Sequence, residues 1–230
     1  MSRDGAWNTW INRWTAEEAR HGIVIRDYLM ATRGVDPNEL EDLRMVHMTA
    51  GYQTPYENDM LHTVSYVTFQ ELATRISHRN TGRISNDQTC EGMLARVALD
   101  ENLHMLFYRN LLGAALDLEP NAAMISIKDV VVNFQMPGAG MPGWGRKSVQ
   151  IALAGIYDPK SHLEGVIAPV LRAWNIFNRE DFTGEGAAAR DELAAYIASA
   201  EVDVSKFVEK RDAHFDRLEA RGQNPIRLMD

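Results

Sequence analysis

The sequence predicts an all-α fold, organised as one domain over residues 1–230. Apolar residues recur at intervals of three and four in several long segments, which is the period of a helix with one buried face. No segment alternates strictly between apolar and polar residues, and hairpin signals such as Asn-Gly are absent. Turn-forming residues divide the chain into about six to eight helices.

The predicted helices follow one another between recognisable breaks. The first spans residues 7–28, and the second follows the break at 33–40, where Asp36 is suited to cap the helix and Pro37 to occupy its first position. Further breaks are expected at 52–59, 78–87, 117–123, 135–145 and 181–186. The segment at 135–145 is rich in glycine and proline, so we expect an ordered loop there. After 181–186 a polar helix should run to about Arg221.

Composition limits the location and the partners of the protein. The hydrophobic fraction is 45% and the charged fraction 24%, and no apolar run is long enough to span a membrane. With 24 basic and 32 acidic residues the net charge is −8, which argues against nucleic-acid binding. A single cysteine, Cys90, and the lack of a visible secretory signal favour a reducing compartment. We therefore expect a cytoplasmic protein.

Three predicted helices carry charged side chains on the stripe that should be buried. The stripes consist of Trp7, Ile11, Trp14, Glu18, His21, Ile25, Tyr28; Met60, Val64, Val67, Glu71, Thr74, His78; and Leu94, Val97, Glu101, His104, Tyr108, Leu111. A buried carboxylate is strongly unfavourable unless it is protonated, paired or bound to a metal. Each stripe therefore needs a partner for its glutamate.

The spacing of these groups suggests a metal as that partner. Positions i and i+3 share one side of a helix, so Glu18 with His21, and Glu101 with His104, can each hold an ion. Two Glu-x-x-His helices combined with glutamates from two others form the dinuclear site of ferritin-like bundles. Carboxylates and imidazoles suit iron or manganese. We predict a dinuclear metal site, with a structural network of carboxylate–histidine hydrogen bonds as the alternative.

Several segments resemble one family, the soluble acyl-acyl-carrier-protein (acyl-ACP) desaturases, and especially its actinobacterial branch. These segments are WTAEEARHG (14–22), TFQELATRISHRNTG (68–82) and DENLHMLFYR (100–109), followed by FQMPG, GIYDP and REDFTGEG. Ala19 replaces the asparagine that is usual in the first of them. The resemblance implies a ferritin-like helical bundle with extra C-terminal helices, in which the N-terminal helices of the family are missing.

The resemblance also implies roles for individual residues. Glu18 and Glu101 would bridge two irons, His21 would bind the first, and Glu71 and His104 the second. Asp100 would hydrogen-bond His21 and fix its tautomer. Thr74 would lie beside the oxygen-binding face; the alternative is a hydroxyl group bonded to its own helix backbone.

In this family, a di-iron centre supplied with electrons by a ferredoxin-type donor uses O2 to introduce a cis double bond into an acyl chain. The resemblance therefore implies two iron ions, with manganese as an alternative occupant, and acyl carrier protein as a partner. It leaves a second hypothesis open, in which a catalytically silent bundle binds metal, a carrier or a partner protein without turnover.

A complete family site has six protein ligands, and this sequence offers five. The sixth is a glutamate on a helix preceding the WTAEENRHG segment of the family. Three interpretations stay open: the sequence lacks the start of an active desaturase; the protein is naturally short, with weakened iron binding or a vacancy filled by water or a partner; or it is a non-catalytic relative that keeps the bundle for association. Asp4 lies too far from Glu18 along the helix to replace the missing glutamate, about 21 Å at 1.5 Å per residue. Glu17 is rotated by about 100° from Glu18 and should face away. His78 is too distant from Glu71 to share its ion.

Two surface features could serve association. An uncovered apolar face around Trp7, Trp10 and Trp14 should drive self-association, with a homodimer as the expected assembly. Arg20, with other arginines of the first helix, could face an acidic carrier protein, although solvated helix charges are the simpler interpretation.

Overall fold

The computed structural model describes residues 5–51, 59–223 and 228, and within these ranges the protein contains helices and no strand. The α-helices are α1 (Ala6–Ala31), α2 (Pro37–Ala50), α3 (Met60–Ile84), α4 (Gln88–Leu118), α5 (Pro120–Val132), α6 (Trp144–Leu153), α7 (Pro159–His162), α8 (Ala168–Ala173) and α9 (Gly184–Ala220). Two 3-10 helices, η1 (Pro137–Gly140) and η3 (Ile176–Asn178), and one π-helix, η2 (Leu163–Ile167), complete the described part. The all-α prediction is confirmed.

Aspartates begin four of these helices. The Asp36 carboxylate accepts the backbone N–H groups of Asn38 and Glu39 at the start of α2, with Pro37 in the first turn as predicted. Asp59, Asp87 and Asp158 cap α3, α4 and α7 in the same way. Each carboxylate satisfies N–H groups that the helix itself leaves without a partner.

The helices differ from the expectation in two details. The break predicted at 78–87 is confined to residues 85–87, because α3 continues to Ile84. Gly82 lies inside α3, where a Cβ atom would stand 3.1 Å from the Cα of Glu91, so this glycine permits close packing of α3 on α4. The described part also has one helix more than the expected six to eight, because α7, η2 and α8 form a continuous helical run over 159–173 that a π turn divides. Of the break at 52–59, residues 52–58 lie outside the described residues.

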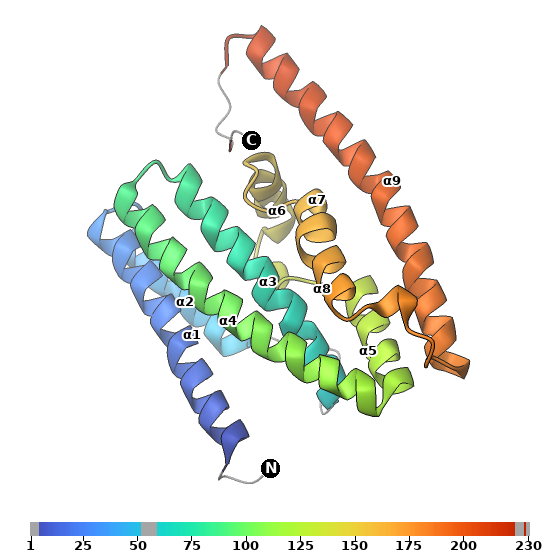
Figure 1. Cartoon of the computed structure of the whole chain (residues 1–230). Helices are drawn as coiled ribbons and strands as arrows, with labels where there is room; N and C mark the ends of the chain where they lie inside the picture. The colour runs from blue at the N-terminus through green and yellow to red at the C-terminus, as the bar shows by residue number, and fades with distance from the viewer. Residues whose placement is uncertain (1–4, 52–58, 224–227, 229–230) are drawn as a thin grey trace.

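The antiparallel pair of α3 and α4 is the centre of the bundle (Figure 1). The short connection at 85–87 makes these helices neighbours along most of their length. Helix α1 packs on α4, and α5 contacts α3, α4 and α9. This arrangement brings the three charged stripes of the sequence onto the adjacent helices α1, α3 and α4.

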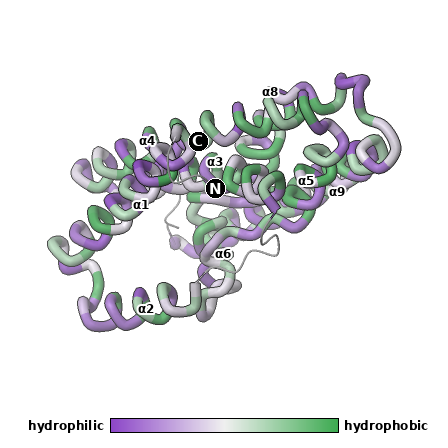
Figure 2. Tube along the Cα trace, turned by 90° about the horizontal axis from the view of Figure 1, so that it is seen from below, coloured by the Kyte–Doolittle hydropathy of each residue, from purple (hydrophilic) through white to green (hydrophobic). Residues whose placement is uncertain are grey.

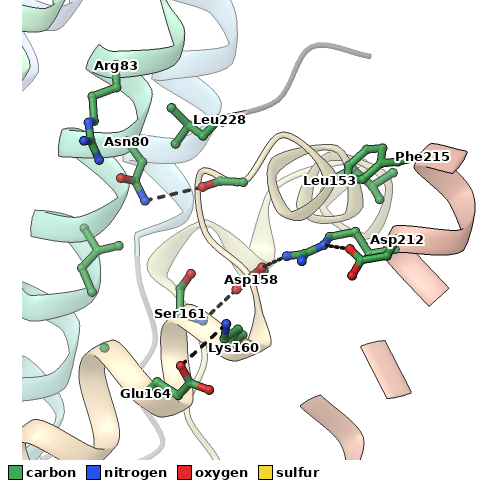
Figure 3. Close-up of a pocket in the computed structure, with 14 residues that line it drawn as sticks. Asn80, Arg83, Leu153, Asp158, Lys160, Ser161, Glu164, Asp212, Phe215 and Leu228 are labelled. Atoms are coloured by element: carbon green, nitrogen blue, oxygen red, sulfur yellow. Dashed lines mark hydrogen bonds and ion pairs between the residues drawn. The ribbon is translucent and has the colours of Figure 1, made fainter. Parts of the chain in front are cut away.

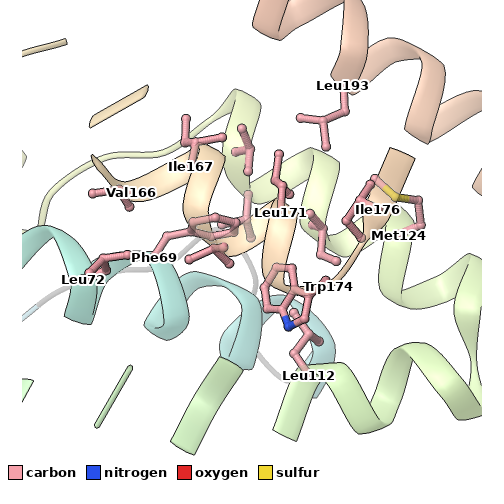
Figure 4. Packing of buried hydrophobic residues seen from close by; sticks show 14 of the residues in the cluster. Phe69, Leu72, Leu112, Met124, Val166, Ile167, Leu171, Trp174, Ile176 and Leu193 are labelled. Atoms are coloured by element: carbon pink, nitrogen blue, oxygen red, sulfur yellow. The ribbon is translucent and has the colours of Figure 1, made fainter. Parts of the chain in front are cut away.

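The main hydrophobic core joins α3, α4 and α5 to the helices that follow them (Figure 4). Phe69 meets Trp174 edge to face with ring centroids 5.8 Å apart. The Trp174 indole N–H donates to the Arg109 carbonyl oxygen at 2.8 Å, so the polar end of this buried ring is satisfied. Leu112 and Leu193 are completely buried in the same core. These contacts fix α4 against the second half of the chain.

The exposed apolar surface is not where the sequence led us to expect it. Trp7, Trp10 and Trp14 are half-buried against the core, and the Trp10 ring stacks on Phe107 at 3.7 Å between centroids. Helix α2 has no buried residue and lies at the periphery (Figure 2). The exposed apolar side chains of α1, α2 and the facing part of α4 include Ile23, Met30, Leu43, Met45, Val46, Met48, Leu99 and Leu103. None of the described helices is long and apolar enough to cross a membrane.

Candidate metal centre

Helices α1, α3 and α4 bring all five sequence-predicted ligands to one place. Glu18, Glu71, Glu101 and His104 each offer a ligand atom, and these four atoms lie within 4.8 Å of one another. The Nδ1 atom of His21 lies 3.4 Å from Glu101 Oε1. We refer to Glu18, His21, Glu71, Glu101 and His104 as the carboxylate–histidine cluster.

Two of the glutamates lie between the two imidazoles. On one side, His104 Nδ1 is 3.1 Å from Glu18 Oε1 and 3.4 Å from Glu101 Oε2. On the other side, His21 Nδ1 is 3.8 Å from Glu18 Oε2 and 3.4 Å from Glu101 Oε1. Glu18 and Glu101 therefore present one oxygen to each imidazole. Glu71 Oε2 lies only on the His104 side, 3.4 Å from Nδ1.

The inward-facing atoms of the cluster lack hydrogen-bond partners. Glu71, Glu101, His104 and His21 are buried, whereas the Glu18 side chain is 37% exposed. Within the described part of the chain, the following buried atoms make no hydrogen bond of acceptable geometry: Glu18 Oε1, His21 Nδ1, Glu71 Oε2, Glu101 Oε2 and His104 Nδ1. An unsatisfied buried polar atom costs on the order of 1–3 kcal/mol. Five of them directed at one another fit a site for metal cations.

Electrostatics show how the chain compensates for this charge without a cation. Burial raises the pKa of Glu71 to about 8, and the carboxylates of Glu101 and Glu18 add to the rise. Burial alone would lower the pKa of His104, but the surrounding carboxylates, Glu101 foremost, raise it to about 12. The same competition raises the pKa of His21 to about 10. All three pKa shifts favour the protonated forms of these groups, which lowers the negative charge of the cluster.

Each imidazole is held from outside by an acid. Asp100 Oδ2 lies 3.3 Å from His21 Nε2, which is the contact that the family resemblance implies. The Arg20 guanidinium donates to the same oxygen at 2.8 Å, so Arg20 is engaged at the centre and is not simply a solvated helix charge. The Thr74 hydroxyl donates to the backbone carbonyls of Gln70 and Glu71, which is the structural alternative considered for it.

Three contacts at the centre were not anticipated. Glu17 does not face away, because its Oε2 atom lies 2.9 Å from His104 Nε2. His78 reaches the centre too, with Nε2 3.5 Å from Glu101 Oε1. The Trp14 indole N–H donates to Glu71 Oε1 at 3.2 Å. Trp14 lies one turn before Glu18 on the same stripe, so the spacing could have indicated that it lies near the cluster. Asp4 lies outside the described residues.

One hollow of the described structure is separate from the cluster (Figure 3). It has a volume of about 840 Å³ and opens between α3, the segment 153–165 and the end of α9. Its charged groups are largely paired with one another: Arg211 with Asp158 at 3.3 Å, and Lys160 with Glu164 at 4.0 Å. No residue of the carboxylate–histidine cluster lines it.

Comparison with known proteins agrees with this geometry. The model of the fatty acid desaturase family matches residues 1–221. DesA1 of Mycobacterium tuberculosis, named an acyl-[acyl-carrier-protein] desaturase, is 52% identical over 229 residues, which cover 96% of this chain and 67% of DesA1. DesA2 of the same organism, with the same activity in its name, is 32% identical over 170 residues, covering 74% of this chain and 61% of DesA2.

A solved structure shows the same fold. The X-ray structure of DesA2 from Mycobacterium tuberculosis H37Rv superimposes with a TM-score of 0.65 and 28% sequence identity, covering 76% of this chain and 67% of that one. This chain thus spans about two thirds of the length of these mycobacterial relatives. The ferritin-like helical architecture is confirmed, and the chain belongs to the fatty acid desaturase family, among relatives named acyl-ACP desaturases.

Proposed function

We propose that this protein is an O2-dependent acyl-ACP desaturase that introduces a cis double bond into an acyl chain carried by acyl carrier protein. The observation that carries the proposal is the set of five buried, inward-facing donor atoms without hydrogen-bond partners. The names of the relatives support the substrate class. A ferredoxin-type electron donor, a homodimeric assembly and a cytoplasmic location belong to the same proposal.

The cluster would hold two metal ions. His21 would bind the first ion, His104 and Glu71 the second, and Glu18 and Glu101 would bridge them. Carboxylate oxygens with neutral imidazoles suit iron, and manganese is the alternative occupant. Iron bound there would supply the O2-dependent oxidation that removes two hydrogens from the acyl chain.

Residues around the cluster would orient the metal-binding histidines and keep water away from them. Asp100 and Glu17 accept from the outer nitrogens of His21 and His104, which leaves both Nδ1 atoms directed into the centre. Trp10 and Trp14 each meet the His104 ring edge to face, with centroids 6.1 and 6.4 Å away, and cover that side from water. We propose that Thr74, one turn after Glu71, lies beside the site where O2 reacts.

Iron content and product formation test the proposal together. The purified chain should contain two irons and, after anaerobic reduction and exposure to O2, convert acyl-ACP to an unsaturated product. Glu101→Ala should abolish dinuclear binding, because it removes a carboxylate that faces both imidazoles. Glu201→Ala, at an exposed position on α9, is the control and should keep both irons.

Two outcomes would contradict the proposal. Two irons retained in Glu101→Ala would refute the assigned bridge. Two irons in the unchanged chain without any unsaturated product would instead favour the catalytically silent bundle.

A further inference from the structure

One oxygen of Asp100 is shared between a histidine and an arginine. Asp100 Oδ2 lies 3.3 Å from His21 Nε2, and the Arg20 guanidinium donates to the same oxygen at 2.8 Å. Asp100 is buried, and Arg20 and His21 are consecutive residues of α1. The acid behind His21 therefore also carries a cation from the helix of His21 itself.

The acid behind the other histidine gives an internal comparison. Glu17 Oε2 lies 2.9 Å from His104 Nε2, while the Arg20 guanidinium stays 3.8 Å from the other oxygen of Glu17, Oε1. The histidine contact is thus short where no guanidinium donates to the accepting oxygen, and longer where Arg20 does. A charge-assisted hydrogen bond from a guanidinium leaves less negative charge on an oxygen for a second donor.

We propose that Arg20 is a positioning residue of the metal centre, which weakens the hydrogen bond between His21 and Asp100 by sharing its acceptor oxygen. The inference rests on the proposed iron site and concerns its reduction potential. A carboxylate behind a ligating histidine raises the basicity of the imidazole, and a more basic ligand favours Fe³⁺ over Fe²⁺. Arg20 therefore keeps the potential of the iron higher, so that the centre accepts electrons from its donor more readily.

A second arginine approaches Asp100 from the other side. Arg96 Nη2 lies 3.5 Å from Asp100 Oδ1, the oxygen that does not face His21. The Arg96 side chain is 73% exposed, against 50% for Arg20, and solvent screens the more exposed charge more strongly. Both distance and screening make Arg20 the arginine that controls the His21 contact.

NMR of protein labelled with ¹⁵N-histidine tests this hydrogen bond in the metal-free chain. In Arg20→Gln the proton on His21 Nε2 should resonate further downfield than in the unchanged chain, because Asp100 Oδ2 then accepts from the imidazole alone. Arg20→Lys keeps a cation there and should shift the signal less. Arg26→Gln is the matched control, because Arg26 pairs with the exposed Asp27 on the same helix, and it should leave the signal unchanged. Circular dichroism verifies that each variant is folded.

The midpoint potential of the iron-loaded protein is the second measurement. Arg20→Gln should raise the preference for Fe³⁺ over Fe²⁺ about tenfold, which lowers the potential by about 59 mV per electron. Arg20→Lys and Arg26→Gln should keep the potential of the unchanged chain. This pattern follows charge and not packing, because lysine alters the shape of the side chain as glutamine does.

Several results would overturn the role of Arg20. One is a His21 signal in Arg20→Gln that does not move, and another is an equal shift in Arg20→Lys or Arg96→Gln. If Arg20→Gln fails to fold, the unchanged chain still decides. The Nε2 proton of His104 should resonate further downfield than that of His21, and the opposite order would refute the proposal. Failure of the unchanged chain to bind iron would overturn the proposed function, whereas the metal-free NMR comparison tests Arg20 separately.

Discussion

Glu17 Oε2 lies 2.9 Å from His104 Nε2, and this contact mirrors the one between Asp100 and His21 across the cluster. Both histidines therefore direct Nδ1 inward and Nε2 toward an acid. Arg20 approaches both acids, with Nη2 2.8 Å from Asp100 Oδ2 and 3.8 Å from Glu17 Oε1. An acid on the outer nitrogen fixes the tautomer of a ligating imidazole and raises its basicity.

Glu17→Ala should weaken metal binding by about 10- to 100-fold, which is the usual effect of removing an acid behind a ligating histidine. Glu17→Gln keeps an oxygen acceptor without the charge, so its metal affinity should lie between those of the unchanged chain and Glu17→Ala. Metal titration by calorimetry measures both variants. Glu164→Ala, an exposed change outside the cluster, is the control. Equal affinity in Glu17→Ala and the control would show that His104 does not depend on Glu17.

Trp14→Phe tests whether the indole N–H supports the Glu71 carboxylate. The change removes the donor 3.2 Å from Glu71 Oε1 and keeps an aromatic ring against His104. Metal affinity should fall about tenfold, because Glu71 loses the group that orients it. The matched control is Trp10→Phe, which removes a similar bond of 3.2 Å to the Tyr108 hydroxyl group and should leave the affinity within about twofold. The same loss in both variants would indicate a general packing effect.

Helical periodicity places Glu18, His21, Glu71, Glu101 and His104 on buried stripes, and the pattern of a ferritin-like bundle predicts that these stripes converge. The sequence did not predict Glu17 or His78 at the centre. Both contact a residue of another helix, His104 or Glu101 on α4, and the relative position of two helices is not encoded in the spacing along either one. A flexible glutamate one position off the stripe still reaches the outer edge of an imidazole presented by a neighbouring helix.

Helix ends also show that the sequence reveals local interactions but not contacts between helices. Asp36 and Pro37 were readable as a helix start because capping is a local interaction. Gly82 was read as part of a break, although it serves the approach of α3 to α4. A glycine that ends a helix and one that makes room for another helix look alike in a single sequence.

Gly186→Ala should destabilise the fold where α9 meets α5. A Cβ atom there would overlap Asn121 Oδ1 and lie 2.7 Å from the Asn121 Cα. The same oxygen accepts the Thr183 backbone N–H directly before α9. Overpacking of this kind costs about 1–3 kcal/mol in the free energy of unfolding. Gly92→Ala is the matched control, because that helical position has nothing within 4 Å and should gain about 0.5–1 kcal/mol. Chemical denaturation measures both, and unchanged stability of Gly186→Ala would show that Asn121 moves aside without cost.

His162 should make stability depend on pH below neutrality. Its Nδ1 accepts the Tyr157 hydroxyl proton at 2.6 Å and its ring stacks on Phe134 at 4.7 Å, and burial lowers the pKa of His162 to about 4. An unfolded histidine has a pKa of about 6.5, so between these values the unfolded chain binds more protons than the folded one. The folded protein is therefore most stable with respect to His162 above pH 6.5. Its free energy of unfolding decreases as the pH falls from 6.5 toward 4.

The full effect is about 3 kcal/mol, because the pKa difference of about 2.5 units corresponds to 1.36 kcal/mol per unit. Denaturation curves of the unchanged chain and of His162→Leu between pH 7.5 and about pH 4 isolate it, since carboxylates elsewhere titrate in both proteins alike. The free energy of unfolding of the unchanged chain, relative to that of His162→Leu, should fall as the pH falls. The reason is that unfolded His162 binds a proton in this range that folded His162 does not, whereas leucine binds none. A difference that stays constant over this range would mean that His162 is protonated in the folded state despite its burial against Tyr157 and Phe134.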